Sequence, residues 1–238
     1  MVWQAPEGMD EYLEPTELCD SDNEEIKKKA GDIIKDAKTP KEAVMKIFLF
    51  VRDEIAYGMD IVDARASRTL KKGMGACLQK PTLQIALLRA VGIPARYHRA
   101  NVRPDWVQGI LHPQAYKRIP NPEPYYVWCE CYVSGKWVSC EALLDKALYK
   151  AAIEKGLIAT EQIPTIDWDG ENDLVIVKPW VTEDTFPSMD DVFKKVAWMY
   201  RPEFIARIGR FFGNRHINRL RKKGKGQGKT AVVYQGVV

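Results

Sequence analysis

Apolar residues repeat at helical spacing in the first third of the chain. A capping box, Thr39-Pro40-Lys41-Glu42, opens residues 39–58, and an earlier box, Ser21-Asp22-Asn23-Glu24, opens residues 21–38. In such a box the first hydroxyl and the last carboxylate satisfy the free amides of a helix start. One face of the second segment is apolar and carries Ala43, Val44, Ile47, Phe48, Val51 and Ile55. The pattern predicts two helices, 21–38 and 39–58.

A third segment, residues 77–91, is apolar nearly all round and follows a glycine-rich turn at Gly73 and Gly75. Proline is tolerated only in the first turn of a helix, so Pro81 places the start at about Cys77 or Leu78. Gly92-Ile93-Pro94 ends the segment. We therefore expect a buried central helix with Cys77 at its beginning.

The pattern then changes to strands. Residues 95–102 have strand character, and residues 125–133 and 136–140 flank Ser134-Gly135, a two-residue hairpin turn. Between them, residues 103–124 form a proline-rich connector of the length used for lids and binding loops. Helices followed by antiparallel strands indicate an α+β fold. Further elements are predicted as a helix at 145–155, a strand at 174–177 and a helix at 190–200.

Composition narrows the class of protein. The hydrophobic fraction of 46% can fill a core, no apolar run reaches membrane-spanning length, and the N-terminus lacks a basic and apolar leader. Five cysteines, an odd number without dense spacing, fit a reducing compartment. We expect a cytoplasmic globular protein. Cys129-Glu130-Cys131 has no matching Cys/His pair elsewhere, so neither a structural metal nor another cofactor is predicted.

The net charge of +4 is unevenly distributed, because the positive excess lies between residues 201 and 229. There an amphipathic basic helix is expected over 202–223, before a Gly/Lys-rich linker, and for residues 230–238 a strand and a disordered end both stay open. We divide the chain into a core, 1–190, and a basic C-terminal helix and tail, 191–238. No nucleic-acid motif is present, so no nucleic-acid partner is expected, whereas the tail suits contact with an anionic surface.

The start of the central helix is the strongest chemical signal. A thiol at a helix N-terminus lies where free amides and the helix dipole favour negative charge, which lowers its pKa and makes it a better nucleophile. Cys77 is therefore a candidate nucleophile. The alternative is an inert core thiol, because free cysteines are often buried.

The order of these elements resembles the transglutaminase-like superfamily, a relative of the papain architecture, over roughly residues 12–145. The resemblance is carried by these segments: Glu14-Pro15-Thr16-Glu17-Leu18, Phe50-Val51-Arg52-Asp53-Glu54-Ile55-Ala56-Tyr57, Arg65-Ala66-Ser67, Gly75-Ala76-Cys77-Leu78-Gln79-Lys80, Leu88-Arg89-Ala90-Val91-Gly92-Ile93-Pro94-Ala95-Arg96 and Tyr132-Val133-Ser134-Gly135-Lys136-Trp137-Val138. It implies N-terminal helices and a central buried Cys helix packed on an antiparallel sheet.

Members of this superfamily usually use a Cys-His-Asp triad for acyl transfer. The resemblance therefore implies acyl-transfer chemistry here, with one residue of the triad replaced. Cys77 matches the nucleophile, but Tyr126 occupies the position that matches the histidine. The acid matches Glu141 or, in a shifted register, Asp145. A phenol is protonated at neutral pH and cannot replace imidazole as a base, yet it can donate to an oxyanion or act as a general acid.

Other residues are candidates for supporting roles. His112 on the connector could replace the missing histidine, and His98 on the 95–102 strand could also reach the site. Gln79 could polarise a carbonyl or only cap the helix, and Trp128 could bind substrate or only pack in the core.

The resemblance predicts a cysteine-dependent enzyme acting on a small-molecule or peptide acyl or carbonyl substrate. Acyl transfer, amide or thioester cleavage, and cyclisation or condensation all stay open, so the enzyme class is acyltransferase, hydrolase or cyclase. The alternative is a catalytically degenerate domain that binds a peptide or metabolite without turnover, and a third reading is an adaptor that acts through its basic tail.

Overall fold

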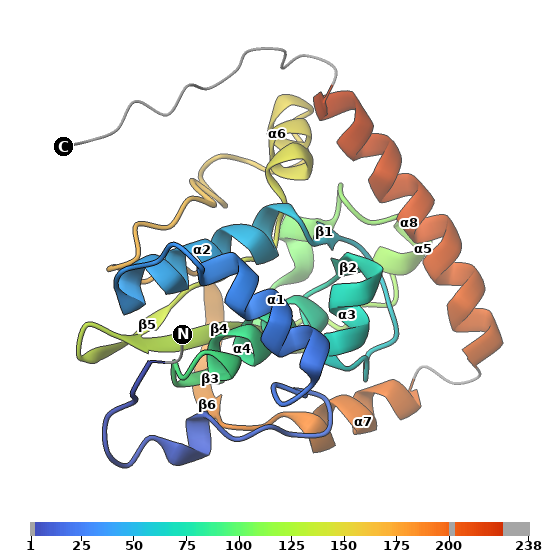
Figure 1. The fold of residues 1–238 in the computed structure, drawn as a ribbon. Coiled ribbons are helices and arrows are strands. Elements are labelled where there is room, and N and C mark those ends of the chain that lie inside the picture. The colour runs from blue at the N-terminus through green and yellow to red at the C-terminus, as the bar shows by residue number, and fades with distance from the viewer. Residues whose placement is uncertain (1–2, 200–202, 226–238) are drawn as a thin grey trace.

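The computed structural model describes residues 3–199 and 203–225. Its sheet has four antiparallel strands in the order β5-β4-β3-β6, visible edge-on behind the helices in Figure 1. The strands are β3 (Ala95–Val102), β4 (Glu123–Val133), β5 (Lys136–Ser139) and β6 (Pro179–Phe186). The α+β prediction is confirmed.

The N-terminal helices are α1 (Glu24–Ile34), α2 (Pro40–Asp53), α3 (Ala66–Lys72) and α4 (Gln79–Ala90). Helix α4 packs against α1, α2 and α3 on one side and against β3 and β4 on the other. Every residue of α4 except the last is buried, as its apolar sequence predicted. This central helix joins the helical layer to the sheet and fixes the position of the segment before it.

Helix boundaries differ from the sequence predictions for local reasons. Helix α1 is capped by Asn23, whose side chain accepts from Glu25 N at 2.9 Å, and it ends at Ile34, well before residue 38. Thr39 caps α2 as predicted, accepting from Glu42 N at 3.2 Å. Helix α2 ends at Asp53, because the chain just after it forms a short strand, β1 (Ala56–Tyr57). This strand pairs in parallel with β2 (Met74–Gly75). This pairing holds the end of α2 beside the turn that leads to Cys77.

The hairpin between β4 and β5 has the predicted turn, with φ of 54° at Ser134 and 81° at Gly135. Residues 103–124, expected as one connector, contain two short helices, η2 (Pro104–Val107) and α5 (Pro113–Tyr116). The strand predicted at 174–177 is reduced to a bridge between Leu174 and Cys140, and β6 was not predicted. A short helix, η1 (Asp10–Tyr12), lies near the N-terminus.

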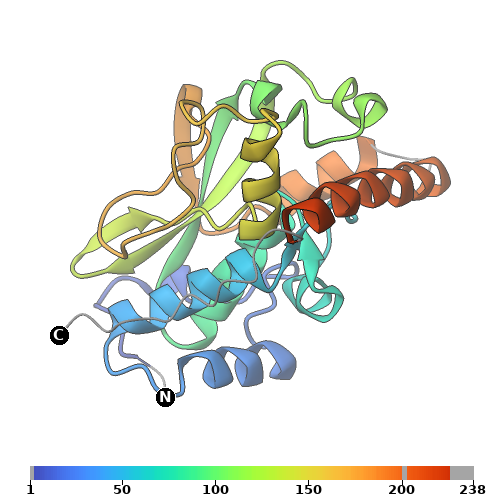
Figure 2. The ribbon, with the colours of Figure 1, turned by 90° about the horizontal axis from the view of Figure 1, so that it is seen from above.

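The last helices are α6 (Lys146–Glu154), α7 (Asp190–Met199) and α8 (Glu203–Lys225). Figure 2 shows α8 along one side of the molecule with one end against α6, and contacts join the two helices. Residues 230–238, for which a strand or a disordered end was open, lie outside the described residues. In the part of the chain that is described, no helix has both the length and the apolarity to cross a bilayer.

Candidate active site

The turn before α4 is held by Gln79. Its Oε1 accepts from Ala76 N at 3.0 Å, while its Nε2 donates to the carbonyl oxygens of Ile61 at 2.9 Å and Val62 at 3.2 Å. The close packing needs Gly75, since a Cβ there would lie 2.9 Å from Cβ of Gln79. With its amide engaged at both ends, Gln79 shapes the loop that presents Cys77.

Cys77 is the one half-exposed thiol among the five cysteines; Cys19, Cys129, Cys131 and Cys140 are buried. Helix α4 begins two residues later, at Gln79, so the thiol precedes the first turn. Burial and then the carboxylate of Glu123 raise the pKa of Cys77 well above its ordinary value, although the amides of Cys77 and Leu78 act in the opposite direction. The expectation of a lowered thiol pKa is therefore wrong, because burial and acidic neighbours outweigh the helix start.

Tyr126 lies on β4 and is fully buried. Its hydroxyl donates to Oε1 of Glu141, a residue just beyond β5. Burial, followed by the charge of Glu141 and its hydrogen bond, raises the pKa of Tyr126 well above its ordinary value, and the charge of Cys77 adds to the effect. The phenol therefore carries its proton throughout the physiological range and serves as a donor.

Glu141 accepts at both carboxylate oxygens, since Ile176 N donates to Oε2 at 2.6 Å. Burial raises the pKa of Glu141 to about 7, against the opposing hydrogen bonds from Tyr126 and the backbone. A carboxylic acid that titrates near neutrality beside a phenol can take up or release a proton at physiological pH.

Glu123 was missed by the sequence interpretation. Ala100 pairs with Tyr126 and Val102 with Glu123, so β4 has one residue more than β3 between the two pairs. This bulge turns Glu123 to the same face as Tyr126, as bulges do near active sites. No hydrogen bond or ion pair to its carboxylate is found within residues 3–199 and 203–225. Burial raises the pKa of Glu123 to about 7.

The sequence does contain a signal for Glu123, which stands between Pro122 and Pro124 at the start of a strand. Because proline cannot donate to a ladder, two prolines there favour an irregular strand end. Tyr57, on β1, completes the group: burial and then the charges of Cys77 and Glu123 raise its pKa well above the ordinary value. Two phenols and two carboxyls thus lie within electrostatic reach of one thiol.

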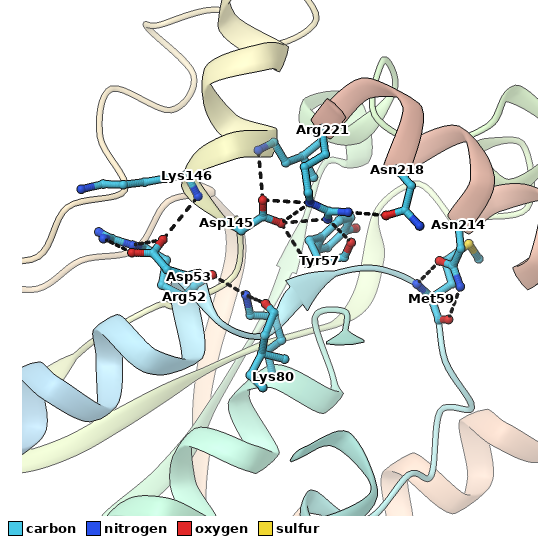
Figure 3. Close-up of polar contacts among 12 residues, drawn as sticks. Arg52, Asp53, Tyr57, Met59, Lys80, Asp145, Lys146, Asn214, Asn218 and Arg221 are labelled. Carbon is cyan, nitrogen blue, oxygen red and sulfur yellow. Dashed lines mark hydrogen bonds and ion pairs between the residues drawn. The ribbon is translucent and has the colours of Figure 1, made fainter. Parts of the chain in front are cut away.

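Asp145, the other candidate acid, belongs to a separate network drawn in Figure 3. Its carboxylate caps α6 by accepting from Leu148 N at 3.0 Å, accepts from Tyr57 N at 3.0 Å, and binds the guanidinium of Arg221 at 2.8 to 3.1 Å. Burial would raise the pKa of Asp145, but Arg221 holds it below the ordinary value. Of the two candidate acids, Glu141 and Asp145, Glu141 is the one that contacts Tyr126.

The side chain of Lys80 is fully buried. Its Nζ donates to the carbonyl oxygens of Arg52 at 3.1 Å and Ile55 at 2.7 Å, as seen below Asp145 in Figure 3. Burial lowers the pKa of Lys80 to about 7, while nearby Asp145 opposes this shift. Lys80 therefore ties the first turn of α4 to the end of α2.

The histidine candidates lie in other environments. His98 contacts Glu130 through Nδ1 at 2.5 Å and stacks on Trp128 with ring centroids 4.3 Å apart. Trp128 is buried and donates to Ser139 Oγ at 3.0 Å, so it packs in the core. His112 caps α5 and meets His216 edge to face at 5.9 Å. The side-chain charges that act most strongly on the Cys77 thiol are those of Glu123 and Glu141, with no histidine among them.

Within the described ranges, no group of three or more His, Cys, Asp or Glu residues is placed to hold a metal ion.

Residues 27–142 match the family model of the transglutaminase-like superfamily. Among solved structures, the chain resembles a candidate cysteine protease from Cytophaga hutchinsonii at 19% identity and a TM-score of 0.46, over 76% of this chain and 54% of that one. It also resembles a candidate protease from Parabacteroides distasonis at 15% identity and a TM-score of 0.37, over 55% of this chain and 24% of that one. The chain thus spans about half of the first protein and a quarter of the second. No curated protein matches the sequence.

Proposed function

The chain belongs to the transglutaminase-like superfamily through residues 27–142, and from this premise we propose that it is a cysteine-dependent acyl-transfer enzyme. In this proposal Cys77 attacks a carbonyl carbon, Glu123 takes the thiol proton, and Tyr126 donates to the developing oxyanion. Glu141 positions Tyr126. The protein would thus use a phenol and a carboxylate in place of the superfamily's imidazole.

One observation carries the proposal: the buried Tyr126–Glu141 pair lies in the electrostatic field of the half-exposed Cys77 thiol. A buried phenol aimed at a reaction centre stabilises developing negative charge more strongly than water does, because it needs no reorganisation. The amides of Cys77 and Leu78 also lie near the sulfur and supply further donors.

In this proposal the reaction passes through an acyl group on Cys77. As the sulfur–carbon bond forms, the thiol proton moves to the Glu123 carboxylate and the carbonyl π electrons move to oxygen. Collapse of this intermediate re-forms the carbonyl and breaks the bond to the leaving group, which receives the proton from Glu123. A second nucleophile then releases the acyl group from Cys77. Water gives hydrolysis, an amine or thiol gives transfer, and a nucleophile of the same substrate gives cyclisation.

The Tyr126–Glu141 pair makes turnover depend on the protonation state of Glu141. Tyr126 has one O–H, which cannot donate to Glu141 and to an oxyanion at the same time. A protonated Glu141 can donate to the phenol oxygen and leave the phenol proton for the substrate. Turnover therefore requires Glu123 ionised and Glu141 protonated, and both have a pKa of about 7.

The test is to trap the acyl-enzyme. The wild-type chain is incubated with a panel of peptide and small-molecule thioesters and activated amides, and adducts are located by mass spectrometry. We expect an acyl group on Cys77 that turns over, none in Cys77→Ser, and an unchanged result in Cys131→Ser, which removes a buried thiol. The proposal fails if no panel member acylates Cys77 and an alkylating reagent modifies it no faster than the buried cysteines.

A second function is favoured by one observation, the raised pKa of Cys77, which leaves little thiolate in the resting protein. A domain that binds a peptide or metabolite without turnover needs no thiolate. That function predicts saturable protection of Cys77 from alkylation by a panel member, with no acyl adduct.

A further inference from the structure

The outer face of α8 is exposed along the helix. It comprises the exposed residues between positions 207 and 222, which are Arg207, Ile208, Phe211, Phe212, Arg215, Asn218, Arg219 and Lys222. The opposite face is buried at Gly213, Ile217 and Arg221, at a spacing of four residues. These positions divide the helix into two faces, as expected for an amphipathic helix, but the outer face is not simply polar.

Three large apolar side chains lie on this outer face. Phe211 is 63% exposed, Phe212 56% and Ile208 44%. Trp198 in α7 is 69% exposed and precedes α8 by a short segment of chain. Isolated exposed apolar residues are ordinary, but three within five positions of one helix form a patch that marks an interaction site.

The charges on the outer face have one sign. Its four basic residues are Arg207, Arg215, Arg219 and Lys222, and the sequence contains no Asp or Glu from 206 to 225. Within the described ranges, no ion pair joins any of these four to an acidic residue. The partner of this surface should therefore be anionic and should also accept apolar side chains.

Helix α8 cannot rotate to bury the patch, because its inner face is pinned. Arg221 binds Asp145 and donates to Tyr57 O at 2.7 Å. Asn214 accepts from Met59 N at 2.7 Å and donates to Met59 O at 2.9 Å, as Figure 3 shows. These bonds hold the apolar side chains outward.

We propose that the outer face of α8 docks on the surface of a bilayer that contains anionic lipids. Ile208, Phe211 and Phe212 enter the boundary between headgroups and acyl chains, and the basic side chains contact anionic headgroups. An amphipathic helix with aromatic residues and a basic polar face binds membranes in this way. A lipid surface fits better than a nucleic acid, because Ile208 has no π face on which a base can stack.

The test uses the full chain and sedimentation with two kinds of vesicle, phosphatidylcholine alone and phosphatidylcholine with phosphatidylserine. We expect sedimentation with the anionic vesicles only, decreasing with salt. Phe211→Ser/Phe212→Ser should abolish it. Each basic residue near an anionic surface contributes about 1 kcal/mol, so Arg215→Gln/Arg219→Gln should weaken it by about thirtyfold.

The matched control is Lys27→Gln/Lys28→Gln on α1, which removes two exposed charges elsewhere and should leave vesicle binding unchanged. Circular dichroism verifies that each variant is folded. The proposal is overturned if wild type and the Phe variant sediment equally, if the α1 variant loses as much binding as the α8 variant, or if a single-stranded RNA oligonucleotide binds while anionic vesicles do not.

Discussion

The hydroxyl of Tyr126 donates a hydrogen bond to the carboxylate of Glu141 in the interior of the protein, and Ile176 N occupies the second carboxylate oxygen. Both side chains are buried. Because Glu141 follows β5 and Tyr126 lies on β4, the hairpin that joins these strands places an acid against a phenol. This pair occupies the positions where the resemblance implied a histidine and an acid.

Replacing Tyr126 by Phe removes one oxygen and keeps the ring. We expect acylation of Cys77 to slow by about 10²- to 10³-fold, the usual cost of one oxyanion donor. Alkylation of Cys77 by iodoacetamide, which develops no oxyanion, should change little. Both rates are measured by mass spectrometry, and equal slowing of the two would show that Tyr126 acts on the thiol or the fold instead.

Acylation by an unactivated substrate should have a bell-shaped pH dependence centred near 7, because it needs Glu123 ionised and Glu141 protonated. Glu123→Gln should lower the rate and remove the acidic limb. Glu141→Gln keeps a donor for the phenol oxygen and should remove the alkaline limb. Glu54→Gln, a substitution at an exposed residue, serves as the control. An unaltered bell in the Glu123 variant would assign the acidic limb to another group.

Glu141 should also make stability depend on pH. Its folded pKa of about 7 exceeds the ordinary 4.5, so the native state binds more protons between these values. Stability therefore falls as pH rises through that window, by about 3 kcal/mol at 1.36 kcal/mol per pKa unit. Glu141→Gln should remove the contribution of Glu141 to this decline in urea unfolding measured from pH 4 to 8, and the contribution of Glu123, whose pKa is also about 7, should stay. A parallel decline in wild type and variant would contradict the assignment.

Arg221→Met should destabilise the protein by about 3–5 kcal/mol, because it leaves the buried carboxylate of Asp145 without its cation. The double variant Asp145→Asn/Arg221→Met removes both charges and should regain much of that loss. Urea unfolding at neutral pH measures the four free energies of unfolding, those of wild type, Arg221→Met, Asp145→Asn and the double variant. If the double variant is less stable than the single variant by the full cost of Asp145→Asn, the two residues are not coupled.

The sequence anticipated the elements that depend on local rules. The Thr39 cap, the hairpin turn at Ser134 and the all-round burial of α4 follow from short-range chemistry and hydrophobic pattern. Strand β6 was not anticipated, because its pairing with β3 is a long-range contact. The burial of Lys80 has a related cause: its partners are carbonyl oxygens at the end of α2, which no pattern around residue 80 reveals.

The sequence by itself determined the nucleophile candidate and the basic C-terminal helix, because each rests on residue type and local spacing. Only the tertiary structure decided which acid accepts a hydrogen bond from Tyr126, since Asp145 forms an ion pair with Arg221 of α8. It also placed Glu123 on the face of Tyr126 through a bulge. The pKa values of Cys77, Glu123 and Glu141 depend first on burial, and burial is a property of the assembled fold.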